Sequence, residues 1–500
     1  MKALLMHRDR DFDLQQELLC NDSSLTQDLE LDTLLRAMAV GDTFLLDVAR
    51  KALFSSFQND MDTILYRQAA LKDCLKNPAV VRALYALAVE AIEQKRNRWL
   101  GIFSQYPGAV LHGAIDLMQM FMDILTRLRD IAQKHAGQFE SDAFRTLFAT
   151  LEKELSDEYL ASTQDHLKQL KFRAGVLVSA ELGRGNEGRN YVLRKPKAQS
   201  WVQQLLGRHP PAFSFRVDPR DEAGGRALSE LQDRGIHLAA NALAQSADHI
   251  LSFFQMLQAE LAFYVGCLNL YGQLAAKGEP VCFPRPAPAG ERRNRFSGLY
   301  DVCLSLHMDH RVVGNTVDAD CKSLVIITGA NQGGKSSVLR SIGLAQLMMQ
   351  CGMFVGADSF DAELCTGLFT HYKREEDATM KSGKFDEEMA RMSDIADTIS
   401  PNSMMLFNES FAATNEREGS EIARQIVCAL LEKRIKVFFV THLYEFARGL
   451  FDKPMEDAIF LRAERRADGT RTFRLVQGEP LETSYGEDLY REIFLVGTEN

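Results

Sequence analysis

The segment GANQGGKS, residues 329 to 336, constrains the fold of this chain more than any other feature. It fits the pattern G-x-x-x-x-G-K-[ST] and lies between an apolar, strand-like run, SLVIIT, and a helix-like run. In such a loop, glycines let backbone N–H groups turn inward around phosphates, Lys335 reaches the β- and γ-phosphate oxygens, and Ser336 can ligate Mg²⁺. The segment therefore predicts a nucleotide-binding P-loop. We expect the nucleotide to contact Gly329, Ala330, Asn331, Gln332, Gly333, Gly334, Lys335, Ser336 and Ser337.

Around this loop, short apolar runs alternate with amphipathic helical patterns. The apolar runs are SLVIIT, MMLF and VFFVTH, and the helical patterns between them include SSVLRSIGLAQLMMQCG and EGSEIARQIVCALLEKR. Alternation of this kind predicts βαβ units on a mostly parallel sheet. We therefore expect a P-loop α/β domain over residues 291 to 500.

Two further polar residues follow strands of this expected sheet. Glu409 comes at the end of SMMLFNE, where a carboxylate could orient water, and His442 follows VFFVT. Parallel strands place both at the same sheet edge as Lys335, so we expect Glu409, His442 and Lys335 to act in catalysis. A solvated Glu409 and a structural His442 are the plain alternatives.

The first part of the chain has a different pattern. From about residue 29 to residue 170, apolar residues recur every three or four positions, which predicts helices. Two β-rich runs, at 176 to 180 and 190 to 193, flank a Gly-rich turn and predict a β-hairpin, and a long buried helix follows residue 235. A Pro-, Gly- and Arg-rich stretch, residues 283 to 298, separates this all-α core and lever region, residues 1 to 290, from the α/β domain.

Net charge, cysteine spacing and hydropathy limit the class of protein and its cellular compartment. The net charge of −10 argues against a wholly basic protein that coats nucleic acid. The nine cysteines show no CxxC pair or zinc-type spacing, so we expect reduced thiols in a cytoplasmic protein. The N-terminus lacks the apolar core of a signal peptide, and no apolar run is long enough for a membrane span.

Taken in order, the motifs resemble those of the MutS family of DNA mismatch repair ATPases, which belong to the ABC class. LVIITGANQGGKSSVLRSIGLAQLMMQCGMFVGADSF is similar to the family's P-loop region, THLYEF to its His-containing switch, and SYGEDLYREIFLVG to its S-Y-G segment. ATMKSGKFDEEMARMSDI resembles the ABC signature segment. The resemblance implies ATP and Mg²⁺ as cofactors, a homodimer closed through the ATPase domains, and Ser382 reaching the nucleotide of the other subunit.

The resemblance weakens upstream of residue 297. YRQAALKDCLKNPAVVRAL and GVLVSAELG look like the family's helical core and lever region. Helical patterns begin so near the N-terminus that we expect a divergent, bacterial-type member without the mismatch-recognition and connector domains. Any DNA-encircling clamp, near residues 172 to 236, would be reduced. The resemblance therefore does not extend to the mismatch-recognition part of the family.

The metal-binding segment departs from the family pattern D-E-x-G-R-G-T. Here Asn408 replaces the Asp, Glu409 keeps the Glu, and Phe411 replaces the first Gly. Ser336 would bind Mg²⁺ directly, and Asn408 and Glu409 through water. Because an amide accepts a hydrogen bond but carries no charge, we expect weak Mg²⁺ binding and a slow ATPase, with an ATP-binding switch as the alternative.

DNA is the partner that the resemblance implies, as duplex or branched DNA. RGNEGRNYVLRKPK offers phosphate contacts, and ERRNRF adds three arginines, although solvated charged loops explain both stretches equally well. A scaffold ATPase like those that organise chromosomes, and a small-molecule kinase, are the other function classes that remain open. The cations that we expect at DNA are Arg184, Arg189, Arg194, Lys195 and Lys197, with Arg292, Arg293 and Arg295 as further candidates.

Overall fold

A computed structural model of the chain describes residues 1–16, 21–99, 107–173, 175–195, 213–374, 383–466 and 468–481. Its described residues divide into two compact units. Unit 1 contains residues 1–3, 79–139 and 145–258, and unit 2 contains residues 4–78, 140–144 and 259–500. Unit 2 contains residues from both sides of residue 290. The domain boundary predicted there stays a prediction.

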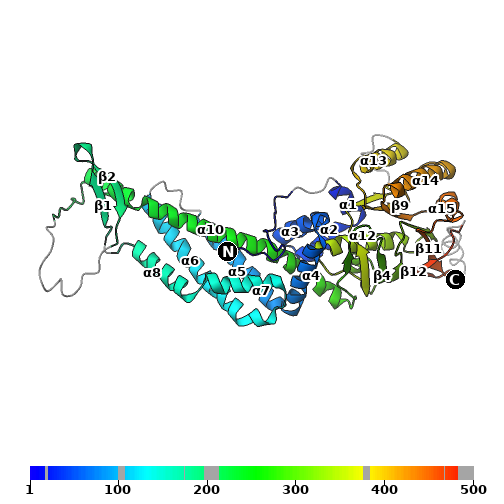
Figure 1. Ribbon diagram of the computed structural model, residues 1–500, viewed down its shortest axis with the longest axis horizontal. Coiled ribbons are helices and arrows are strands. Elements are labelled where there is room, and N and C mark those ends of the chain that lie inside the picture. Colours follow the sequence, from blue (N-terminus) through cyan, green and yellow to red (C-terminus); the bar gives the residue numbers. More distant parts are fainter. Residues whose placement is uncertain are drawn as a thin grey trace, which may run out of the picture. The chain divides into compact units, whose positions relative to one another are not determined.

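Helices and one hairpin make up unit 1 (Figure 1). The hairpin pairs β1 with β2 in antiparallel fashion, as predicted, with Val178 opposite Leu193. Contacts between helices fix the bundle: the rings of Phe121 and Phe254 lie 5.9 Å apart, and Arg127 pairs with Glu90 at 2.8 Å. The elements are α5 (Pro78–Trp99), α6 (Pro107–His135), η2 (Ala136–Gln138), most of α7 (Asp142–Glu154), α8 (Asp157–Leu170), β1 (Val178–Leu182), η3 (Arg184–Asn186), β2 (Gly188–Leu193) and the first part of α10 (Glu222–Ala276).

Helices cover both faces of the main sheet of unit 2. Its strand order is β12-β11-β6-β10-β9-β8, and all neighbours are parallel except the edge strand β12. Alternate residues of each strand face opposite sides, so the central strands β6, β9 and β10, which are covered on both faces, are almost wholly apolar. The strands are β6 (Leu324–Gly329), β8 (Leu368–Tyr372), β9 (Met404–Asn408), β10 (Lys436–Val440), β11 (Ala458–Arg465) and β12 (Arg471–Gln477).

One core of unit 2 forms between the sheet and three helices (Figure 1). Met405, Phe407 and Phe439 point from the strands towards α13 (Lys384–Thr398), α14 (Glu416–Glu432) and α15 (Tyr444–Phe451). On the opposite face, α12 (Lys335–Cys351) packs so closely that a Cβ on Gly343 would lie 2.8 Å from Leu406. This layered arrangement confirms the predicted parallel sheet and places the P-loop helix directly behind it.

The stretch from 283 to 298 is part of a second sheet in unit 2, rather than a plain linker. It forms β3 (Arg285–Ala287) and β4 (Asn294–Leu299), which join β5 (Asn315–Asp318) and β7 (Ser359–Glu363) in the order β3-β7-β4-β5. The proline at 286 is tolerated because β3 is an edge strand. The remaining elements of unit 2 are α1 (Asp22–Asp28), α2 (Leu31–Ala39), α3 (Thr43–Phe54), η1 (Ser56–Gln58), α4 (Met61–Lys76) and α11 (Val302–His307), with the last part of α10.

Two helical segments reach the length and hydropathy of a membrane span. They are residues Pro107–Gln138 and Glu222–Ala276, and 56% and 72% of their most apolar windows are buried inside the protein. Burial of this kind is the behaviour of core helices. The cysteines within the described ranges are free thiols, as expected.

Candidate nucleotide-binding site

The P-loop joins the end of β6 to the start of α12. Left-handed backbone at Gly329 (φ 111°), Gln332 (φ 56°) and Gly334 (φ 83°) turns the chain tightly, and the loop then enters a helix of 17 residues. A Cβ on Gly333 would lie 2.7 Å from that of Ala463 on β11, so glycine is required there. The loop thus has the compact geometry that a phosphate-binding turn needs, directly at a helix N-terminus.

Lys335 is buried at the centre of the loop. Its ammonium donates hydrogen bonds to the carbonyl oxygens of Gly329 and Ala330 at 3.0 and 2.9 Å. Burial lowers the pKa of Lys335 to about 8, although the negative charge of Glu409 opposes this shift. A buried cation held only by neutral carbonyls is poorly compensated, and the anionic oxygens of a phosphate would stabilise it.

The predicted metal residues come together at the carboxyl ends of β6 and β9. Ser336 Oγ donates a hydrogen bond of 3.0 Å to Asn408 Oδ1. Hydroxyl and amide oxygens are ligands that Mg²⁺ accepts, and Mg²⁺ is commonly held by few protein groups together with substrate phosphates. In keeping with that, the described ranges hold no cluster of three His, Cys, Asp or Glu side chains that could bind a metal by itself.

Glu409 and His442 form a pair beside this oxygen cluster. His442 Nε2 donates to Glu409 Oε1 over 2.9 Å, and both side chains are about one-third exposed. The hydrogen bond from His442 lowers the pKa of Glu409, so the carboxylate is ionised at neutral pH. Glu409 itself has left-handed backbone (φ 53°), and its N–H donates to Val440 O on β10 at 2.8 Å. The strand tips therefore meet as the sequence predicts.

A pocket of about 300 Å³ adjoins the P-loop, and no pattern in the sequence indicates it. Gly334 and Ser337 form one side, and the ring of Phe473 on β12 lies against Gly334. Asn315 fixes that strand by donating to Phe473 O at 3.1 Å and accepting from Leu475 N–H at 2.7 Å. Phe473 is remote from the P-loop in sequence, so only the folded sheet reveals the contact.

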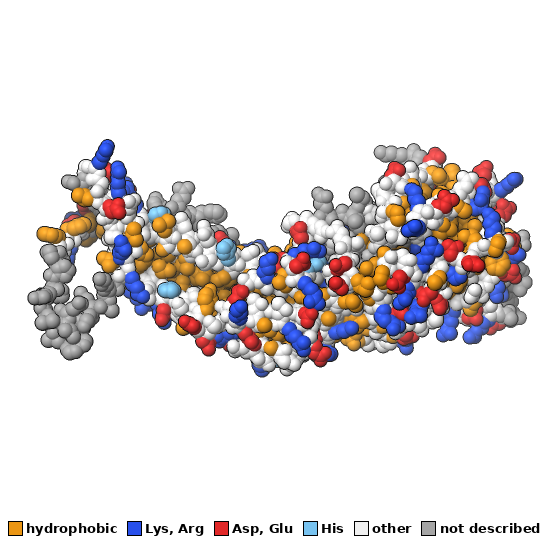
Figure 2. All heavy atoms as spheres, in the orientation of Figure 1, with side chains coloured by type: hydrophobic (Ala, Val, Ile, Leu, Met, Phe, Trp, Pro, Cys, Tyr) orange, Lys and Arg blue, Asp and Glu red, His pale blue; other side chains and the backbone are white. Residues whose placement is uncertain are grey.

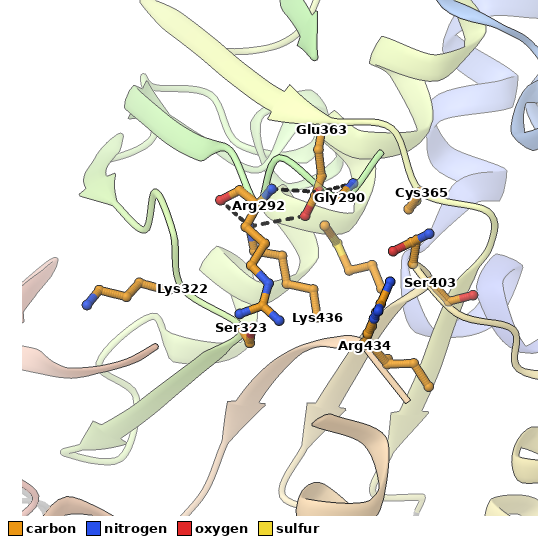
Figure 3. Close-up of a pocket in the computed structure, with 12 residues that line it drawn as sticks. Gly290, Arg292, Lys322, Ser323, Glu363, Cys365, Ser403, Arg434 and Lys436 are labelled. Carbon is orange, nitrogen blue, oxygen red and sulfur yellow. Dashed lines mark hydrogen bonds and ion pairs between the residues drawn. The ribbon is translucent and has the colours of Figure 1, made fainter. Parts of the chain in front are cut away.

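Another pocket, of about 210 Å³, lies at the opposite edge of the sheet (Figure 3). There the carboxylate of Glu363 accepts hydrogen bonds from the backbone of Gly290 and Arg292 and lies 3.6 Å from the ammonium of Lys436. Burial lowers the pKa of Lys436 to about 8. These contacts anchor the loop before β4. The pocket is separate from the edge that carries the P-loop.

The DNA candidates separate into two groups. Lysine and arginine side chains gather on the hairpin (Figure 2), and the four candidates described there are exposed. By contrast, Arg292, Arg293 and Arg295 pair with Asp457, Glu291 and Asp361 at 3.5, 3.4 and 2.9 Å. Their charge is therefore offset within unit 2. The hairpin residues are Arg184, Arg189, Arg194 and Lys195.

Three predicted features lie outside the described residues. They are Lys197, Ser382 and the SYGEDLYREIFLVG segment, residues 484 to 497. The part of the signature-like segment that follows Gly383 forms the amphipathic helix α13, with Met392 buried in the core and Met389 partly buried against it.

Comparison with known proteins gives matches in both parts of the chain. Residues 59–277 match the MutS2 N-terminal domain, and residues 325–494 match MutS domain V. A DNA mismatch repair protein MutS from Thermus aquaticus is 32% identical over 303 residues, which is 60% of this chain and 36% of that relative. A protein of the same name from Streptococcus mutans serotype c is 27% identical over 221 residues, 44% of this chain and 26% of that relative.

The chain thus spans about a quarter to a third of the length of these relatives. The matched regions include the P-loop, Asn408, Glu409 and His442 together with most of the helical region. On this evidence the chain belongs to the MutS family.

Proposed function

We propose that this protein binds ATP with Mg²⁺ at the P-loop and hydrolyses it slowly. The observation that carries the proposal is the meeting of three groups at one sheet edge. These are the buried Lys335 ammonium, the Ser336–Asn408 pair and the Glu409–His442 pair. Residues 325–494 match MutS domain V, whose members are ATPases, and this agrees with the proposed chemistry.

Each group has a distinct role in the proposal. Glu409 accepts a proton from the attacking water as general base, and His442 orients its carboxylate and senses the γ-phosphate. Lys335 exchanges its two carbonyl partners for phosphate oxygens. Mg²⁺, when bound near Ser336 and Asn408, supplies positive charge that offsets the phosphates. The base of the nucleotide occupies the pocket beside Phe473.

Asn408 makes hydrolysis slow. Its neutral amide hydrogen-bonds Ser336 but adds no charge to attract Mg²⁺. An ATP-binding switch with little turnover is the second candidate, and the same amide favours it. Steady-state phosphate release separates the two. We expect wild-type protein to exceed Glu409→Ala by at least about a hundredfold if Glu409 is the base. Equal rates of phosphate release in wild type and Glu409→Ala would reject hydrolysis at this site. If fluorescence then still showed ATP binding, the ATP-binding switch would remain as the function.

We further propose that the ATPase works on DNA as a homodimer in the cytoplasm. Two relatives bear the name DNA mismatch repair protein, and the exposed cations of the hairpin can contact backbone phosphates. Ser382 would complete the nucleotide site of the other subunit. A binding panel of homoduplex, mismatched and branched DNA, each with and without ATP and Mg²⁺, tests the DNA part and identifies the preferred structure. Sedimentation of a monomer in both states would reject the dimer.

A further inference from the structure

The segment that carries Glu409 has an unusual backbone. Glu409 and Phe411 both have left-handed φ angles, 53° and 64°, although neither is a glycine. Such a conformation costs a side-chain-bearing residue on the order of 1 kcal/mol, so surrounding contacts must hold it in place. Ser410 lies between them and is completely buried.

His371 on β8 makes several of these contacts at once. Its Nδ1 lies 2.7 Å from Ser410 Oγ, and its ring stacks on Phe411 with centroids 5.3 Å apart and an angle of 18°. Ser410 Oγ also lies within hydrogen-bond distance of the main-chain carbonyl of His371. One imidazole thus fixes both residues that follow Glu409.

The other ring nitrogen of His371 contacts a different element. Nε2 lies 3.0 Å from the carbonyl oxygen of Glu388, in the first part of α13. A carbonyl can only accept, so Nε2 carries the proton. Burial lowers the pKa of His371 to about 4, which leaves the ring neutral and Nδ1 an acceptor, so the single hydroxyl proton of Ser410 is shared between Nδ1 and the carbonyl oxygen of His371. The two nitrogens therefore have fixed and different roles.

We propose that His371 is a positioning residue that ties α13 to the Glu409 segment through its two ring nitrogens. The inference rests on the proposed ATP hydrolysis and deepens it. Because α13 follows the segment that contains Ser382, a displacement of this helix would be transmitted through Glu388 O, His371 and Ser410 to the general base. The hydrolysis rate would thereby depend on the position of α13.

Two substitutions of His371 each remove one of its two ring-nitrogen contacts and keep the other. In His371→Asn the side-chain amide can occupy the place of Nδ1 and keep the contact with Ser410, whereas in His371→Gln it can occupy the place of Nε2 and keep the contact with Glu388. Ser410→Ala removes the hydroxyl alone. His166→Asn, at an exposed position of α8, serves as the matched control.

We expect both His371 variants and Ser410→Ala to lower kcat by about tenfold while the Kd for a fluorescent ATP analogue stays at the wild-type value. Since His371→Gln and Ser410→Ala break the same contact, the double variant should lose no more than either single variant. Wild-type kcat in His371→Asn or in His371→Gln, a loss confined to Kd, or fully additive losses would each overturn the inference. Glu409→Ala sets the background rate. If wild-type protein does not exceed that background, the proposed hydrolysis fails as well, whereas clear wild-type hydrolysis with unaffected His371 variants rejects the link alone.

Discussion

Ser336 Oγ donates a hydrogen bond to Asn408 Oδ1 across 3.0 Å, joining the end of the P-loop to the tip of β9. The two groups that we propose hold Mg²⁺ are thus in contact, although residue 408 is an amide where the family pattern has a carboxylate. Only the charge is missing. This makes the substitution at residue 408 a test of electrostatics, with shape held nearly constant.

Asn408→Asp should strengthen Mg²⁺ binding and raise kcat. A full negative charge beside a divalent cation contributes on the order of 1 kcal/mol even in a high dielectric, so the Mg²⁺ concentration for half-maximal hydrolysis should fall roughly tenfold. Titration of phosphate release with MgCl₂ measures this. Asn241→Asp, at an exposed position of α10, is the control for added charge. An unchanged Mg²⁺ requirement would show that residue 408 does not contribute to the metal site.

Nucleotide binding should be linked to a proton at Lys335. Burial lowers the pKa of Lys335 to about 8, and bound phosphates favour its charged form and raise that pKa. At about pH 8.5 the free protein is largely deprotonated there, so ATP binding should take up most of one proton, and at about pH 7 almost none. Calorimetry in buffers of different ionisation enthalpy counts the protons. Uptake that persists in Lys335→Met would assign the effect to another group.

Gly419 on α14 should be essential for the shape of the Glu409 segment. A Cβ there would lie 2.3 Å from the carbonyl oxygen of Phe411, a backbone atom that cannot turn aside. We expect Gly419→Ala to lower the free energy of unfolding by about 1 to 3 kcal/mol and to reduce kcat. Chemical denaturation and phosphate release measure the two effects.

The matched control for that substitution is Gly449→Ala on α15. No atom lies within 4 Å of a Cβ at Gly449, so alanine should raise the free energy of unfolding by about 0.5 to 1 kcal/mol through helix propensity. Similar effects of the two alanines would contradict the proposed role of the Phe411 carbonyl.

The hairpin should contribute non-specific phosphate contacts to DNA binding. Reversal of Arg194 and Lys195 to glutamate should weaken binding to all duplexes similarly and reduce the slope of log K against log salt by roughly one to two. Fluorescence anisotropy over a salt series measures both quantities. Reversal of the exposed Lys134 and Lys153 serves as the control. Equal losses in the two pairs would point to net charge instead of the hairpin.

The placement of the candidate nucleotide-binding residues could be predicted from the sequence because it depends on local order. A P-loop requires a strand before it and a helix after it, and parallel strands bring their carboxyl ends to one edge. Lys335, Ser336, Asn408, Glu409 and His442 all follow from those two rules. The hairpin and the helix after Ser382 also follow from residue periodicity.

Other features arise from contacts that no local pattern encodes. Phe473 reaches the P-loop only because β12 pairs with β11 at the sheet edge, and the charge of Arg295 is offset by Asp361 only because β4 lies beside β7. In the sequence His371 is only a residue of an expected strand. Its contacts with Ser410 and Glu388 exist because β8 pairs with β9 and α13 packs over them.

The sequence by itself therefore determined the chemistry of the site, through the types and order of residues at the strand ends. The tertiary structure decided which of these residues contact one another and what holds them. The physical reason is that hydrogen bonds, ion pairs and ring contacts depend on distances of a few ångströms between residues far apart in the chain, and only the packing of the sheets and helices sets those distances.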